Sequence, residues 1–133
     1  MSSSLQPAVE LLDALARMNE RLVALEQRFW TQPEIARVNR AMDVRRYDYG
    51  LAIEAYVDVG TSDGHSMAWL LEIVWDEPRW IVTARVTTNR GDHEEVVMRH
   101  PDIEATSLEE LIAALEDATT VLIESAESPK WVA

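Results

Sequence analysis

Residues 69–86 read WLLEIVWDEPRWIVTARV, two apolar runs joined by the turn-like segment Asp-Glu-Pro-Arg at 76–79. A four-residue turn at this point predicts an antiparallel hairpin. The turn fixes the cross-strand neighbours, which are Trp75 with Trp80, Ile73 with Val82, Leu71 with Ala84 and Trp69 with Val86. Since all of these side chains are apolar and share one side of the hairpin, we expect that side to form core beneath helices.

The opposite side of the same hairpin is mixed in character. It carries Leu70, Glu72 and Val74 on the first strand and Ile81, Thr83 and Arg85 on the second. Glu72 lies diagonal to Arg85, within reach of a cross-strand charge pair. Apolar side chains on an uncovered sheet face commonly mark an interface. The predicted partner-binding residues on this face are Tyr56, Leu70, Val74, Ile81 and Arg85.

The flanking sequence predicts further strands on both sides of the hairpin. Apolar residues alternate with polar ones through residues 47–59, which is typical of a half-buried strand. The loop at residues 60–66 contains Asp63-Gly64, a common turn pair. A fourth strand is expected at about residues 93–99, before Pro101, with its register left open. The prediction is therefore a four-stranded antiparallel meander.

Two amphipathic helices are expected to frame this sheet. The first has a stripe at Leu11, Leu15, Met18, Leu22, Leu25 and Phe29. Thr31, Pro33 and Glu34 resemble a second helix start, so we predict a short helix or kinked extension through Ile35, Val38 and Met42. Ser107 to Glu110 forms a capping box that opens the last helix, with the stripe Leu108, Leu111, Ile112, Leu115 and Leu122. The predicted fold is an α+β two-layer sandwich; a coiled-coil dimer through the first stripe is the alternative use of that helix.

Length and composition indicate one domain over residues 1–133, with frayed tails at 1–6 and 126–133. The chain has no cysteine, which excludes disulfides and thiolate chemistry. Its N-terminus lacks the pattern of a signal peptide, and no run approaches the roughly 18 apolar residues of a membrane span. We therefore expect a cytoplasmic protein that does not bind membranes.

The net charge of −12 is distributed unevenly along the chain. Residues 1–46 carry a net charge of +1, residues 47–91 carry −4 and residues 92–133 carry −9. An acidic surface repels nucleic-acid phosphates and attracts basic proteins. The exposed side of the last helix is the second predicted partner-binding surface, although a solvated face explains the same residues. Its acidic residues are Glu109, Glu110, Glu116, Asp117 and Glu124.

Signatures of catalysis and of cofactor binding are weak. The four glycines form no phosphate-binding loop, and no nucleophile motif is present. His65, His93 and His100 lack the spacing of a metal site, so we expect neither metal nor cofactor. Glu54 and Glu72 are candidates for an acid–base pair on the mixed face. An enzyme or small-ligand protein, with a pocket between sheet and helices, stays open as an alternative.

These observations favour a non-enzymatic protein-binding module that recognises a basic protein partner. In size, acidity and order of elements the chain resembles bacterial immunity proteins, which implies a small bacterial protein that neutralises a cognate toxin by binding it. A secretion chaperone is similar in the same respects. A homodimer or assembly subunit, held by the helical stripe or the open sheet face, is the third alternative.

Overall fold

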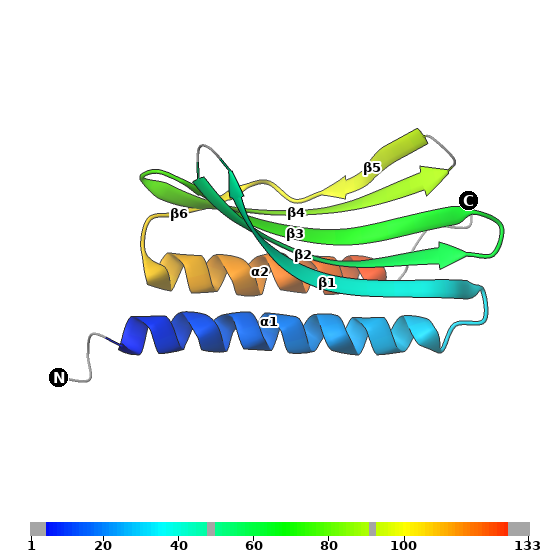
Figure 1. The fold of residues 1–133 in the computed structure, drawn as a ribbon, viewed down its shortest axis with the longest axis horizontal. Helices are drawn as coiled ribbons and strands as arrows, with labels where there is room; N and C mark the ends of the chain where they lie inside the picture. The colour runs from blue at the N-terminus through cyan, green and yellow to red at the C-terminus, as the bar shows by residue number, and fades with distance from the viewer. Residues whose placement is uncertain (1–4, 48–49, 91–92, 128–133) are drawn as a thin grey trace.

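The computed structural model describes residues 5–47, 50–90 and 93–127. Its elements are α1 (Gln6–Trp30), β1 (Ile35–Tyr47), β2 (Gly50–Thr61), β3 (His65–Asp76), β4 (Arg79–Arg90), β5 (His93–Arg99), β6 (Ile103–Ala105) and α2 (Leu108–Ala126). The strands form one twisted sheet, and both helices lie against the same face of it (Figure 1). The predicted α+β class and element order are confirmed, but within the described residues the sheet has six strands instead of four.

The sheet is an antiparallel meander with the strand order β1-β2-β3-β4-β5, and β6 pairs with β4. The register predicted for the central hairpin is confirmed, including the pair Trp75–Trp80 and the pair Trp69–Val86. The Asp63-Gly64 turn is also confirmed, and Gly64 has a positive φ of 91° that suits glycine. The fourth predicted strand corresponds to β5, which spans His93–Arg99.

The core lies between the sheet and the two helices. Trp69 is fully buried, and its ring packs on Phe29 of α1 with ring centroids 4.8 Å apart. The other apolar residues of the hairpin's helix side are buried with it, namely Leu71, Ile73, Val82, Ala84 and Val86. Trp75 and Trp80 contact each other, 4.9 Å between centroids, and are half-buried. The stripe proposed for a coiled coil is therefore used largely within the chain, because Met18, Leu22, Leu25 and Phe29 are all buried there.

The predicted helix after residue 31 is wrong. Helix α1 ends at Trp30, where the Thr31 hydroxyl donates to the carbonyl oxygen of Arg28 at 2.7 Å, and β1 begins at Ile35. The ladder between β1 and β2 has a register shift between Ile35 and Arg37. Because of this irregularity, the side chains of both Ile35 and Val38 point into the core. The two buried residues are therefore three positions apart, which is the spacing expected on one face of a helix.

Helix α2 starts as the capping box predicts. The Ser107 hydroxyl accepts a hydrogen bond from the backbone N–H of Glu110 at 3.1 Å. The Glu110 carboxylate in turn accepts from the backbone N–H and the hydroxyl of Thr106, both at 3.3 Å. The first bond satisfies an N–H group that the first turn leaves unpaired, and the other two tie Glu110 to the residue before the N-cap. Of the predicted tails, residues 1–4 and 128–133 lie outside the described residues.

Candidate functional site

The predicted sheet-face residues lie together on the face that the helices leave uncovered. Tyr56 pairs with Leu70, and Leu70 pairs with Arg85, so these three side chains form one cross-strand row. Val74 and Ile81 pair in a second row. All five are half-buried, although no helix covers this side (Figure 1). We call the five residues the sheet patch.

Charged side chains also lie between the two rows of the sheet patch, the first of which ends in Arg85. Glu54 pairs with Glu72 between them, and Glu72 pairs with Thr83. The Glu54 carboxylate lies 3.7 Å from the guanidinium of Arg45 on β1. The candidate acid–base pair thus consists of neighbours on an open surface, one of them matched by an arginine. This arrangement presents apolar side chains around a strip of negative charge.

The acidic residues of α2 are all exposed, but two of them have structural roles. Glu110 caps the helix, and Glu116 lies 3.4 Å from the guanidinium of Arg17 on α1. Within the described residues, no ion pair or hydrogen bond of the side chain is found for Glu109, Asp117 or Glu124. These three are the part of the predicted acidic surface that is available to a partner.

The two predicted surfaces do not come together. Helix α2 buries Leu111, Leu115 and Leu122 toward the core, so its acidic side points away from the sheet. The sheet patch lies on the other side of the sheet, because its residues alternate along the strands with the buried Leu71, Ile73 and Val82. Figure 1 shows that both helices cover the same face of the sheet. The acidic residues of α2 would therefore attract a compact partner on the sheet patch through their long-range electrostatic field, without contacting it.

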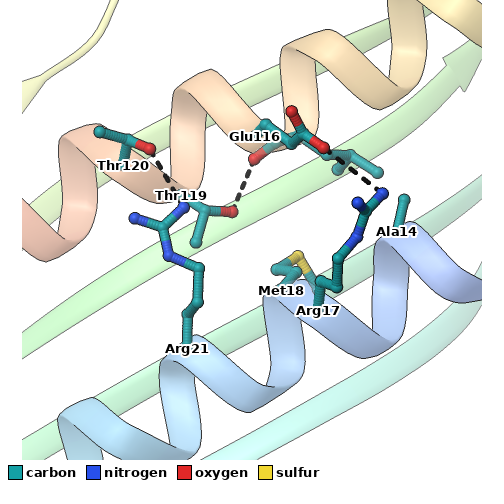
Figure 2. A pocket seen from close by; sticks show the side chains of 8 residues that line it. Ala14, Arg17, Met18, Arg21, Glu116, Thr119 and Thr120 are labelled. Carbon is teal, nitrogen blue, oxygen red and sulfur yellow. Dashed lines mark hydrogen bonds and ion pairs between the residues drawn. The ribbon is translucent and has the colours of Figure 1, made fainter.

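A hollow of about 240 Å³ lies between α1 and α2 (Figure 2). Arg21 donates a hydrogen bond to the hydroxyl of Thr120 at 3.0 Å, and Arg17 pairs with Glu116 across the same seam. No ion pair of Arg21 with a carboxylate is found in the described part of the chain. The remaining lining comes from Ala14, Met18, Leu115 and Thr119. This hollow lies between the two helices, whereas the small-ligand alternative left open by the sequence places a pocket between sheet and helices.

The histidines lie apart from the sheet patch. His65 Nδ1 lies 3.8 Å from a carboxylate oxygen of Asp63 in the turn between β2 and β3. A hydrogen bond from the Thr61 hydroxyl, assisted by the His65 N–H, lowers the pKa of Asp63. His93 and His100 belong to β5 and the segment after it. In residues 5–47, 50–90 and 93–127, no group of three histidines or carboxylates is arranged to hold a metal ion.

Sequence reasoning missed a further apolar surface at the free edge of the sheet. Val44 and Met42 of β1 are 73% and 36% exposed. At the start of α1, the N-cap Leu5 is 70% exposed, and Val9 and Leu12 of the helix are 55% and 66% exposed. We call these five residues the edge patch. The alternation of Val38, Met42 and Val44 with Asn39, Asp43 and Arg45 could have revealed the strand, but the three-residue step from Ile35 to Val38 favoured a helix.

Both halves of the edge patch lie on one side of the molecule. Arg40 of β1 contacts Asn19 and Glu26 of α1, at 3.0 and 3.2 Å, so these two residues mark the flank of α1 that faces β1. Leu12 and Leu5 precede Asn19 at seven-residue intervals, which places them on that same flank. The edge patch therefore spans both layers of the fold.

Comparison with known proteins assigns no family, because no family model, curated protein or solved structure matches the chain. None of the described helices is both long and apolar enough to cross a membrane.

Proposed function

We propose that this protein is a cytoplasmic, non-enzymatic bacterial module that binds another protein through the sheet patch. The observation that carries this proposal is the uncovered sheet face. In a two-layer fold the second face of a sheet normally carries polar residues, because it meets water. Here Tyr56, Leu70, Val74 and Ile81 lie on that face, and apolar surface of this kind favours burial against a partner.

The charges around the sheet patch favour a basic partner. Glu54 and Glu72 lie between its apolar rows, where a lysine or arginine of a partner would find two carboxylates. The net charge of −12 and the exposed Glu109, Asp117 and Glu124 add a field that accelerates encounter with a basic protein. Neutralisation of a toxin, in the manner of immunity proteins, fits this chemistry. Escort of a secreted protein fits the same surface as an alternative.

A capture experiment with matched variants tests the proposal. The immobilised protein is incubated with lysate of the source organism, and retained proteins are identified by mass spectrometry. Leu70→Lys introduces a like charge for a basic partner, and Val97→Lys on the exposed part of β5 is the control. We expect a basic protein that the wild type and V97K retain and that L70K loses. Equal retention by all three proteins, or none above background, would refute binding through the sheet patch.

A small anionic ligand in the hollow between the helices is the second candidate function. The observation that favours it is the half-buried Arg21, whose guanidinium donates to the Thr120 hydroxyl and not to a carboxylate, although the protein is rich in carboxylates. A guanidinium retains further donors that suit a carboxylate or phosphate group. Thermal melting with inorganic phosphate, or with acetate, tests this idea against Arg21→Gln. A rise in Tm with either anion that R21Q abolishes would support it, and no rise with either would remove it.

A further inference from the structure

We propose that two copies of this chain pair through β1, antiparallel, around a two-fold axis at Val44. The dimer would have one continuous sheet and two neighbouring copies of α1. Among the described residues β1 pairs with β2 alone, so its second edge presents unpaired backbone groups along 13 residues. Such an edge is a template for another strand. The proposal concerns the edge of the sheet and does not depend on the function proposed for its face.

Five of the nine large apolar side chains that are exposed among the described residues lie where this pairing would bury them. Val44 is 73% exposed, which is the highest value among the large exposed apolar side chains of the structure's described part. Leu5 and Leu12 of α1 are nearly as exposed, at 70% and 66%. The edge patch thus has an apolar component in the sheet layer and another in the helix layer. A second copy, which presents the same two layers, matches both components at once.

Charge complementarity selects the register. In antiparallel pairing about Val44, Asp43 lies opposite Arg45 of the second copy, and Arg45 lies opposite Asp43. Two opposite-charge pairs therefore flank the contact between the two copies of Val44. An axis at Asp43 or at Arg45 would instead place a charge opposite its own copy. The axis at Val44 avoids this repulsion and places Arg45, which already lies 3.7 Å from Glu54 of its own chain, beside a second carboxylate.

The spacing of the layers agrees with this arrangement. Helix α1 packs beneath β1 and β2. Because neighbouring strands are about 4.8 Å apart, the two copies of the β1–β2 unit, and with them the two copies of α1, would lie about 10 Å apart. Packed helices have interaxial distances of about 8–10 Å. The N-terminal half of the facing flanks would carry the uncharged Leu5, Ala8, Val9, Leu12 and Ala16, and Glu26 farther along the flank is paired with Arg40 of its own chain.

The edge at β1 is also the place where two copies repel each other least. Residues 1–46 have a net charge of +1, whereas residues 92–133 have −9. Helix α2 packs beneath β3, β4 and β6, toward the other side of the sheet. Pairing through β1 therefore keeps the two strongly acidic segments apart.

Charge reversal with rescue tests the proposal. Sedimentation is measured at low salt from about 1 nM to about 1 mM, which covers the usual range of dimer dissociation constants. We expect the wild type to reach twice its mass of 15.1 kDa. Asp43→Arg creates two like-charge contacts and should raise the dimer Kd by about tenfold or more. The double variant D43R/R45D restores both pairs in the opposite sense and should recover most of the lost affinity.

Two further variants separate the alternatives. Leu12→Lys tests the helix layer and should also weaken the dimer, whereas Val97→Lys on β5 should leave it unchanged. Circular dichroism and urea unfolding confirm that each variant is folded, which the exposure of Asp43 and Arg45 favours. A wild type that stays monomeric at every concentration would overturn the proposal. So would a dimer that D43R does not weaken, or a double variant no better than D43R.

Discussion

Leu70 and Leu71 provide a direct test of which sheet face is core. They are consecutive residues of β3 and point to opposite faces. Leu71 is fully buried beneath the helices, and Leu70 is half-buried on the uncovered side. A leucine-to-alanine change removes roughly three carbons, at about 0.8 kcal/mol for each one that is fully buried. Leu71→Ala also leaves a cavity, so the expected loss of unfolding free energy is about 3–4 kcal/mol.

Leu70→Ala should cost far less. About half of the transfer free energy applies, and water fills the space, so we expect a loss of about 1 kcal/mol. Urea unfolding followed by tryptophan fluorescence measures both variants. With a slope near 1.5 kcal/mol per molar, the midpoint should fall by about 2 M or slightly more for L71A and by about 0.7 M for L70A. Equal shifts, or a larger shift for L70A, would contradict the assignment of the faces.

Three other predictions follow from local structure. Ser107→Ala removes the cap of α2 and should lower the unfolding free energy by about 1 kcal/mol in urea, where no change would exclude a role for the cap. Gly50→Ala places a Cβ 2.7 Å from the Trp75 carbonyl oxygen and should cost about 1–3 kcal/mol in the same assay. Thr61→Val should raise the pKa of Asp63 toward the ordinary value of an aspartate in an NMR titration. Because the folded state lowers the pKa of Asp63, the stabilisation from this carboxylate is present at neutral pH and is lost as the pH falls through the folded-state pKa. An unchanged Asp63 titration in T61V would show that the Thr61 hydroxyl does not cause the lowered pKa.

The central hairpin was predictable because two local signals agree there. The turn at 76–79 fixes the register, and the alternation of apolar residues fixes the faces. The register of β3 and β4 follows from these alone, as does the burial of Trp69 and Leu71. The start of α2 was predictable for a similar reason, since a capping box depends on residues only three apart.

Strand β1 was not predictable by the same means. Its irregularity between Ile35 and Arg37 breaks the two-residue period at the point where the strand begins. Pro33, two residues before β1, fits the first turn of a helix equally well. Only pairing with β2, a long-range interaction, distinguishes the two structures. The free edge and the edge patch were missed for this reason, because both belong to β1 and to the flank of α1 beside it.

The sheet patch was found from sequence, but its relation to the acidic helix was not. The pattern of β2, β3 and β4 assigns each side chain to a face, and the structure places all five predicted residues on one face. The leucine stripe of α2 likewise assigns its acidic residues to the side away from the core. That the two surfaces then lie on opposite sides follows once both helices occupy one face of the sheet (Figure 1).

The dimer and the sheet patch together predict a bivalent binder. A two-fold axis perpendicular to the sheet keeps both uncovered faces on the same side, so the two patches would point in one direction. Binding of a partner in solution should then be independent of the dimer, and L12K, whose substitution lies on the helix side of the sheet and far from Glu54, should bind it with an unchanged Kd. Retention on a surface densely coated with the same partner should differ, because two linked sites gain about 100-fold or more in avidity. If L12K dissociates from that surface as slowly as the wild type, the two patches do not act together, whatever the state of the dimer.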